Sequence, residues 1–221
     1  MFKFWAAGLC ASVLVLLAGP VSADLYNGHF TEGVDGLDGW DATPFVLQGQ
    51  ASQQVGSYNP YGTSLPHVLK IDAWNDAGET AFSASTSQYI VVPDGEGMFV
   101  PAGTSALSFY GAGEAVVPTG GSWPEISVSV TYTDTLGTPR TDFYDVTEGD
   151  SAWRLRTLSL LSPLDPYQIV VVQMTLSGDS VPAGETLTAT GYFDDFNFIP
   201  EPATMTALGL GAVLGLLRRR R

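Results

Sequence analysis

The middle of the chain is interrupted so often by glycine, proline, asparagine and aspartate that only short elements fit between the breaks. The runs between these breaks are rich in valine, serine, threonine and aromatic residues, and 67–73 alternates in the manner of a strand. We find no amphipathic helix and no internal repeat here. About ten strands in a region of this length predict an all-β fold, a two-sheet jelly-roll β-sandwich. We expect strands at 25–30, 45–47, 52–55, 67–73, 80–92, 105–111, 125–133, 152–160, 168–176 and 186–198, with a hairpin over 127–144.

The N-terminus, 1–23, has the three parts of a secretory signal peptide. Lys3 supplies the positive start, an apolar stretch runs through Leu17, and small residues precede a cleavage point after Ala23. A permanent N-terminal anchor is the alternative, but the apolar run is short for one. Cys10 is the single cysteine, and because it lies in this segment the domain at 24–199 is expected to contain no disulfide.

The last part of the chain, 200–221, has the layout of a membrane-targeting segment. An apolar run at 203–217 is followed directly by arginines, an order that stops a chain in the membrane with its arginines on the cytoplasmic side. As a helix this run is about 22 Å long, whereas a stable span needs roughly 20 residues. It predicts a short transmembrane helix that holds the chain only transiently. The motif residues are Pro200, Glu201 and Pro202, and the membrane stop is Arg218, Arg219, Arg220 and Arg221.

This tail resembles the PEP-CTERM sorting signal of Gram-negative bacteria. The features that match are the Pro-Glu-Pro, the Gly-Leu-Gly-Ala core at 209–212 and the terminal arginines. The resemblance implies an exosortase-type membrane enzyme as partner, transient insertion into the inner membrane, and a final place at the cell surface or outside. Many bacteria with such proteins make exopolysaccharide. An ordinary C-terminal anchor with a chance Pro-Glu-Pro is the alternative.

The acidic charge of the chain limits the kinds of molecule that it can bind. All 23 acidic residues lie between Asp24 and Pro202, a region whose basic residues are Lys70, Arg140, Arg154 and Arg156. Such an acidic body repels nucleic acid and anionic lipid, so we expect no nucleic-acid partner. It suits a soluble extracellular protein and divalent cations.

The two ends of the domain resemble those of carbohydrate-binding-module and galactose-binding-like jelly rolls. The matching stretches are 26–32 with Gly39-Trp40, 153–155, and 191–198. The resemblance implies that the first and last strands lie together, that Trp40 and Trp153 are in the core, and that oxygens from both strands hold a structural calcium ion. Its matching positions here are Asn27, Glu32 and Asp194, while His29 stands where an aspartate is usual.

Asp194 shares strand parity with Phe196 and Phe198, so it is expected to be drawn inward with them, where a carboxylate needs a cation or several donors. The alternative is that Asp194 and Asp195 cap a strand end in water.

Sugar binding requires exposed aromatic faces beside polar groups, because the C–H side of a sugar ring packs on them. Four aromatic residues in or beside predicted loops are candidates, with ordinary packing as the alternative for each: Tyr58, Tyr61, Trp74 and Trp123.

We expect no enzymatic activity. Gly-Asp-Ser occurs at 149–151 and 178–180, but this motif needs a histidine within reach of the serine. The acidic pairs Asp142 with Asp145 and Glu148 with Asp150 read as solvated loop charges. The sequence therefore predicts an exported surface or matrix protein whose sandwich binds polysaccharide. A purely structural acidic matrix protein is the alternative, and a hydrolase a remote one.

Overall fold

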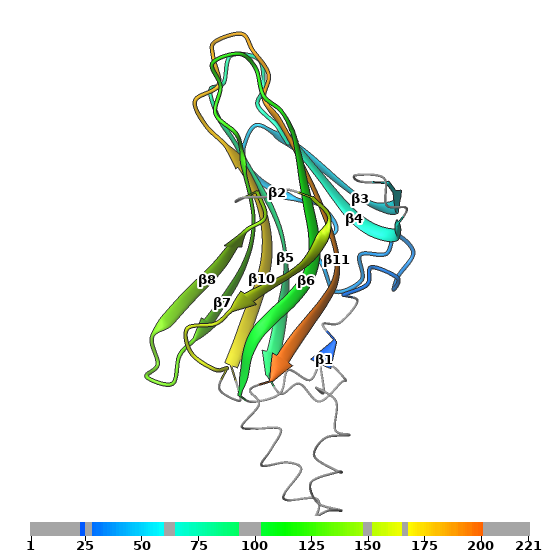
Figure 1. Cartoon of the computed structure of the whole chain (residues 1–221), viewed down its shortest axis with the longest axis vertical. Coiled ribbons are helices and arrows are strands. Elements are labelled where there is room, and N and C mark those ends of the chain that lie inside the picture. The colour runs from blue at the N-terminus through cyan, green and yellow to red at the C-terminus, as the bar shows by residue number, and fades with distance from the viewer. Residues whose placement is uncertain are drawn as a thin grey trace, which may run out of the picture.

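Two antiparallel β-sheets packed face to face make up the part of the chain that the computed structural model describes, residues 23–24, 28–59, 65–92, 103–147, 152–164 and 168–200 (Figure 1). The six-stranded "β11 sheet" has the order β3-β4-β11-β6-β9, with β1 also paired to β11. The five-stranded "β10 sheet" has the order β2-β5-β10-β7-β8. The strands are β1 (Ala23–Asp24), β2 (Phe45–Gln48), β3 (Gln50–Tyr58), β4 (Leu65–Trp74), β5 (Phe82–Val92), β6 (Thr104–Val116), β7 (Glu125–Thr133), β8 (Pro139–Asp145), β9 (Arg154–Ser159), β10 (Gln168–Gly178) and β11 (Thr188–Pro200).

The chain passes from one sheet to the other at almost every connection. Only the hairpins β3–β4 and β7–β8 keep successive strands in one sheet. This alternation makes every neighbouring pair antiparallel and wraps the chain around a single core, as in a jelly roll. The predicted two-sheet jelly-roll sandwich and the hairpin over 127–144 are confirmed.

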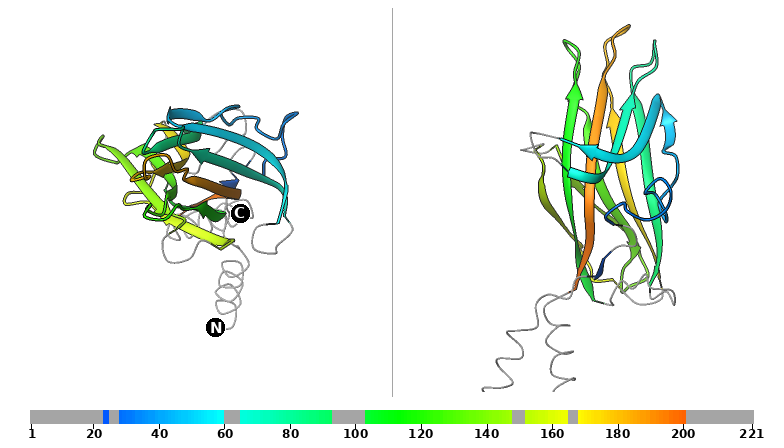
Figure 2. Two further views of the ribbon diagram at one scale, coloured as in Figure 1. Left: turned by 90° about the horizontal axis from the view of Figure 1, so that it is seen from above. Right: turned by 90° about the vertical axis from the view of Figure 1, so that its right-hand side faces the viewer.

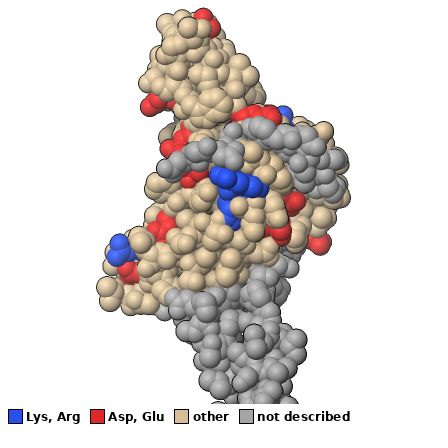
Figure 3. All heavy atoms as spheres, in the orientation of Figure 1, with Lys and Arg blue, Asp and Glu red and all other residues tan. Residues whose placement is uncertain are grey.

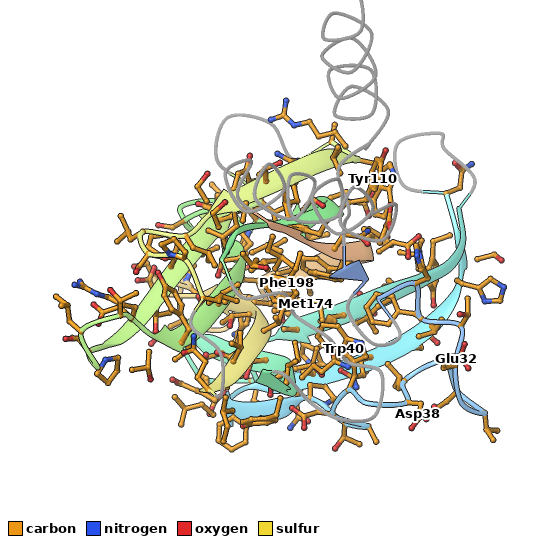
Figure 4. All side chains as sticks on the ribbon, turned by 90° about the horizontal axis from the view of Figure 1, so that it is seen from below. Glu32, Asp38, Trp40, Tyr110, Met174 and Phe198 are labelled. Atoms are coloured by element: carbon orange, nitrogen blue, oxygen red, sulfur yellow. The ribbon has the colours of Figure 1, made fainter. Side chains whose placement is uncertain are left out.

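The core follows from strict alternation along the central strands. In β10 every second residue is buried. The neighbouring strand β7 buries the apolar side chains that lie beside them on the same face of the sheet. Figure 4 shows Trp40, Met174 and Phe198 in the space between the sheets. Aromatic rings fill one end of this core: Phe196 stacks on Phe109 at 5.3 Å and lies 5.5 Å from Trp40. Trp40 is thus in the core, as expected.

A β-bulge in β11 changes which way one acidic residue faces. Phe193 and Phe196 are both in the core although they are three residues apart. The register slips between Asp194 and Asn197, where Asp195 adopts a φ of 56°. Asp194 therefore shares the outer face of Tyr192, and the expectation that it is drawn inward with Phe196 and Phe198 is wrong. Sequence parity cannot reveal such an inserted residue.

The first strand also differs from expectation. Residues 28–30 are a turn, with Phe30 at a φ of 51°, and 25–27 lie outside the described residues. The strand that pairs with the last one comes before the expected first strand: Ala23, the residue before the expected cleavage point, pairs with Phe198 at the bottom of the sandwich (Figures 1 and 2). The Gly28 carbonyl also accepts a hydrogen bond from the Phe196 amide at 3.2 Å.

Candidate functional site

The outer face of the β10 sheet is lined mainly by small uncharged polar side chains. Alternate residues of β5, β10 and β7 point away from the core, and the register places them in rows such as Ser85–Thr175–Ser127 and Ser87–Gln173–Ser129. Gln173 Nε2 donates to Ser85 Oγ at 3.0 Å, so the rows are linked across strands. We call this surface the hydroxyl face. Its central residues are Ser83, Ser85, Ser87, Ser127, Ser129, Thr131, Gln173, Thr175 and Ser177.

A hollow of about 590 Å³ lies at the β2 edge of the hydroxyl face. Phe45 and Tyr89, on its rim, are 67% and 64% exposed. Phe45 pairs with Ser85, four residues before Tyr89, so the two rings belong to positions about 13 Å apart along the strand. The residues that line the hollow are Asp41, Thr43, Pro44, Phe45, Val46, Ser85, Ser87, Tyr89 and Gln173.

The one carboxylate in the hollow is held by the sheet. Asp41 Oδ2 accepts hydrogen bonds from the Ser87 amide at 3.0 Å and from Ser87 Oγ at 2.6 Å. The Asp41 carbonyl accepts further bonds from the side chains of Thr86 and Gln53. These bonds tie the 41–44 loop to β5, so the hollow has a fixed wall rather than a loose one.

Sequence reasoning named none of these residues. In β5, polar residues occupy both faces of the strand. Serines at 83, 85 and 87 point outward, and Thr86 and Gln88 point inward and are buried. The alternation that would reveal an outer face is therefore blurred. Phe45 and Gln173 join Ser85 only through long-range strand pairing. The usable signal was Tyr89 at the end of a run of alternate serines.

Three of the four predicted aromatic residues lie on the outer face of the β11 sheet, although not at one place. Tyr61 lies outside the described residues. Tyr58 packs 5.8 Å from Tyr192 and under Lys70, whose Nζ is 5.9 Å from the Tyr58 ring centre. Trp74 stands at the other end of β4, about 20 Å along the strand from Val68, which pairs close to Tyr58.

Trp123 comes from the β6–β7 connection and is 55% exposed. It lines a second hollow, of about 390 Å³, which we call the tryptophan hollow. Thr188, in the same hollow, pairs directly with Trp74, so Trp74 and Trp123 lie at the same end of this face. The residues that line it are Glu114, Ala115, Val116, Trp123, Thr188 and Thr190.

Trp153 was expected in the core and is not there. It stacks on Tyr110 at 5.8 Å and packs against Val68, Ala112 and Tyr192 on the outer side of the β11 sheet. The reason is that it precedes β9, an edge strand, and reaches over the face of β6 instead of between the sheets.

Two of the three predicted calcium ligands, Glu32 and Asp194, lie within the described residues. Asn27 lies outside the described residues, and Glu32 is an exposed loop residue that Figure 4 shows at the edge of the molecule. Asp194 Oδ1 accepts from the Asp195 amide at 2.8 Å, and Asp195 Oδ1 lies 3.5 Å from Nδ1 of His29. Burial is the main cause that raises the pKa of Asp194 to about 6.

A half-buried carboxyl of this kind suits a cation, but a calcium ion needs six to eight oxygens. Within the described ranges, no three His, Cys, Asp or Glu side chains come close enough together to hold a metal. Calcium at this place stays a prediction that depends on Asn27 and on backbone oxygens.

Only the second Gly-Asp-Ser motif, at 178–180, lies in the described part of the chain. Residues 149–151 lie outside the described residues. Ser180 follows β10 at the end of the sandwich where Gly178 pairs with Phe82. His67 is seven residues along β4 from Trp74 at that end, roughly 23 Å away. This placement does not assemble a serine–histidine pair at Ser180.

Several solved structures of carbohydrate-binding proteins are similar to the chain. TmCBM61, solved in complex with β-1,4-galactotriose, is 16% identical, with a TM-score of 0.43 over 81% of this chain and 95% of that one. The C-terminal family 22 carbohydrate-binding module of Clostridium thermocellum Xyn10B is 18% identical, with a TM-score of 0.42 over 84% and 97%. A module of the β-sandwich superfamily is 14% identical, with a TM-score of 0.48 over 82% and 63%.

A search of proteins with curated functions found no match. Among the described residues no helix is long and apolar enough to cross a membrane, and the apolar run at 203–217 lies outside them. The tail itself is recognised independently of the fold. Residues 198–221 match the PEP-CTERM protein-sorting motif, so the chain carries a sorting tail of that family, which indicates export to the cell surface or beyond.

Proposed function

We propose that this protein is an exported surface or matrix protein that binds a neutral polysaccharide across its hydroxyl face. The observation that carries the proposal is the hollow beside that face, with Phe45 and Tyr89 exposed on its rim. Exposed rings of this size, spaced along a polar surface, can pack against the C–H sides of successive sugar rings. Thr43, which is exposed, and Gln173, which is partly exposed, line the hollow and can donate to and accept from sugar hydroxyls. Ser85 and Ser87 are largely buried beneath them.

The charge of the hollow supports an uncharged ligand. Among the described residues that line it, none is basic, and its carboxylate, on Asp41, would repel an anionic chain. In the view of Figure 3 most of the described surface is neither acidic nor basic, with acidic side chains in small separate patches and one basic patch near the middle. A polymer recognised through hydroxyls and apolar faces fits this surface better than one recognised through its charge.

The sorting tail indicates where in or outside the cell the protein acts. We infer that an exosortase-type enzyme processes 200–221 while the tail holds the chain transiently at the inner membrane, and that the sandwich then meets polysaccharide at or outside the cell surface. The last described strand, β11, runs directly into this tail, so the folded body ends where the sorting segment begins.

Affinity electrophoresis tests the proposal. The full-length chain, purified in a detergent without a sugar headgroup, is run in native gels that contain hydroxyethylcellulose, xylan, galactan or laminarin. Retardation by at least one polymer is expected, and Tyr89→Ala or Phe45→Ala should weaken it about tenfold or more.

Phe143→Ala is the matched control. Phe143 is 66% exposed on the outer side of the same sheet, on edge strand β8, and does not line the hollow. Its loss should leave retardation unchanged. If all four polymers leave the chain unretarded, or if Phe143→Ala weakens binding as much as Tyr89→Ala, binding at this hollow is wrong. Absence of retardation by all four polymers would favour the purely structural matrix role.

A further inference from the structure

The tryptophan hollow, on the opposite sheet, combines the same elements of recognition independently of the hydroxyl face. Trp123 offers a half-exposed indole, and Val116 beside it is 69% exposed. Thr188 and Thr190, on β11, supply hydroxyls on the same wall. An aromatic ring, an apolar floor and hydroxyls in one concave place are what a sugar ring requires.

The carboxylate of this hollow is already oriented. Tyr192 donates its hydroxyl to Glu114 Oε2 at 3.0 Å. Burial, together with this bond to Glu114, raises the pKa of Tyr192 well above its ordinary value, so the phenol stays a donor. One oxygen of Glu114 is thus held in place by a neutral partner. The other can accept from a ligand hydroxyl without reorganisation.

The nearby cation does not neutralise Glu114. Lys70 Nζ lies 2.7 Å from Asp72 Oδ2, and Thr190 donates to Asp72 Oδ1 at 2.7 Å. Thr190 stands between Asp72 and Glu114 in one row across three strands. The lysine charge is therefore balanced by Asp72, and of the described residues lining the hollow none is basic. The occupant that fits is a ligand with hydroxyl donors and an apolar face, but without negative charge.

The two hollows lie on opposite outer faces of one sandwich. One belongs to the β10 sheet and the other to the β11 sheet, with the whole core between them. Packed sheets are about 10 Å apart, so a ligand chain on one face does not reach the other. The tryptophan hollow also sits at the far end from the tail, where β6 ends and β11 begins (Figures 1 and 2).

We propose that the tryptophan hollow is a second site for a neutral carbohydrate, and that one copy of this protein joins two polysaccharide chains through its two faces. This inference rests on the proposed function for its first site only. Bivalence would raise the apparent affinity for a polymer well above that of either site, because the second contact becomes intramolecular or links neighbouring chains.

Stoichiometry tests the second site. The full-length chain, in the same sugar-free detergent, is titrated with the hexasaccharide of whichever polymer retards it in the gels. Two hexasaccharides per chain are expected, falling to one in Trp123→Ala and to one in Tyr89→Ala. Trp153→Ala is the matched control, since it removes a tryptophan from the same sheet face but not from the hollow, and it should keep two. Melting curves check that each variant is folded.

Polymer cross-linking gives the second readout. Mixed with the polymer, the wild-type chain should raise light scattering, and either Trp123→Ala or Tyr89→Ala should abolish the rise. One hexasaccharide per chain, lost in Tyr89→Ala and kept in Trp123→Ala, would overturn the second site and leave the proposed function intact. One hexasaccharide lost only in Trp123→Ala would overturn both the hydroxyl-face site and the bivalence. Absence of binding by every polymer would overturn both proposals.

Discussion

Asp194 is expected to make the stability of the sandwich depend on pH, and Asp194→Asn should remove that dependence. Its pKa is raised from 3.8 to about 6, first by burial, against the opposing effects of the Asp195 amide and of His29. A carboxyl whose folded-state pKa is raised binds its proton more tightly in the folded state. It stabilises the fold fully below pH 3.8, and this stabilisation is lost as the pH rises through about 6.

The size of the effect follows from the shift. Moving from 3.8 to about 6 corresponds to about 3 kcal/mol for a fully shielded group. Asp194 keeps part of its surface in solvent, so screening reduces the difference, and we expect about 1 kcal/mol. Asparagine keeps an Oδ1 acceptor for the Asp195 amide and has no charge to bury. Asp194→Asn should therefore be about 1 kcal/mol more stable than wild type above pH 7, and equal to it near pH 3.

Urea unfolding from pH 3 to 8, followed by tryptophan fluorescence in buffer with a chelator, measures the difference. Asp179→Asn, a change in an exposed loop carboxylate, is the control and should follow wild type at every pH. A stability difference between Asp194→Asn and wild type that is the same at pH 4 and pH 8 would refute the reasoning. Destabilisation at pH 8 would also refute it, because it would mean that the ionised carboxylate is stabilised by its surroundings.

Three further predictions concern the core, the ion and the tail. Phe196→Ala removes a ring that contacts Phe109 and Trp40 and should cost about 3–5 kcal/mol in urea unfolding, whereas exposed Phe143→Ala should change stability by less than about 0.5 kcal/mol. If calcium binds near Asp194, millimolar calcium should raise the melting temperature of the chelated protein, and an unchanged midpoint would contradict the predicted site. The mass of the protein recovered from outside the cell should show that the terminal arginines have been removed, and an intact Arg221 there would contradict processing of the tail.

Alternation predicted strand β7 closely. In β7 the predicted and observed bounds agree, because Val128, Val130 and Tyr132 face a core while Ser129 and Thr131 face solvent. Strand ends were less predictable. The connection between the strands expected at 52–55 and 67–73 is shorter than expected, since β3 continues to Tyr58 and β4 begins at Leu65. Glycine and proline mark breaks in a sequence, but cross-strand pairing can carry a strand through them.

The candidate sites depend on contacts that a sequence does not show. The exposed tryptophan Trp123 was found because it lies in a polar loop. The hollow it lines, however, needs the register that sets Thr188 beside Val116. The hydroxyl face escaped notice because Ser and Thr occupy outer positions on three strands far apart in the chain. Asp194 was misplaced because one extra residue in a bulge inverts the parity of everything before it.

The direction of β11 separates the two proposed tasks of the chain, sorting and carbohydrate binding, in space. This strand runs from Thr188, in the tryptophan hollow, to Pro200, where the sorting tail begins, which is about 40 Å for a strand of 13 residues. An enzyme that acts on the tail at the membrane therefore works at the opposite end from that hollow. Sorting and carbohydrate binding should be separable: Trp123→Ala should reach the cell surface in normal amounts and yet fail to cross-link polymer. A variant that accumulates inside the cell would show instead that the indole is needed to fold or export the body.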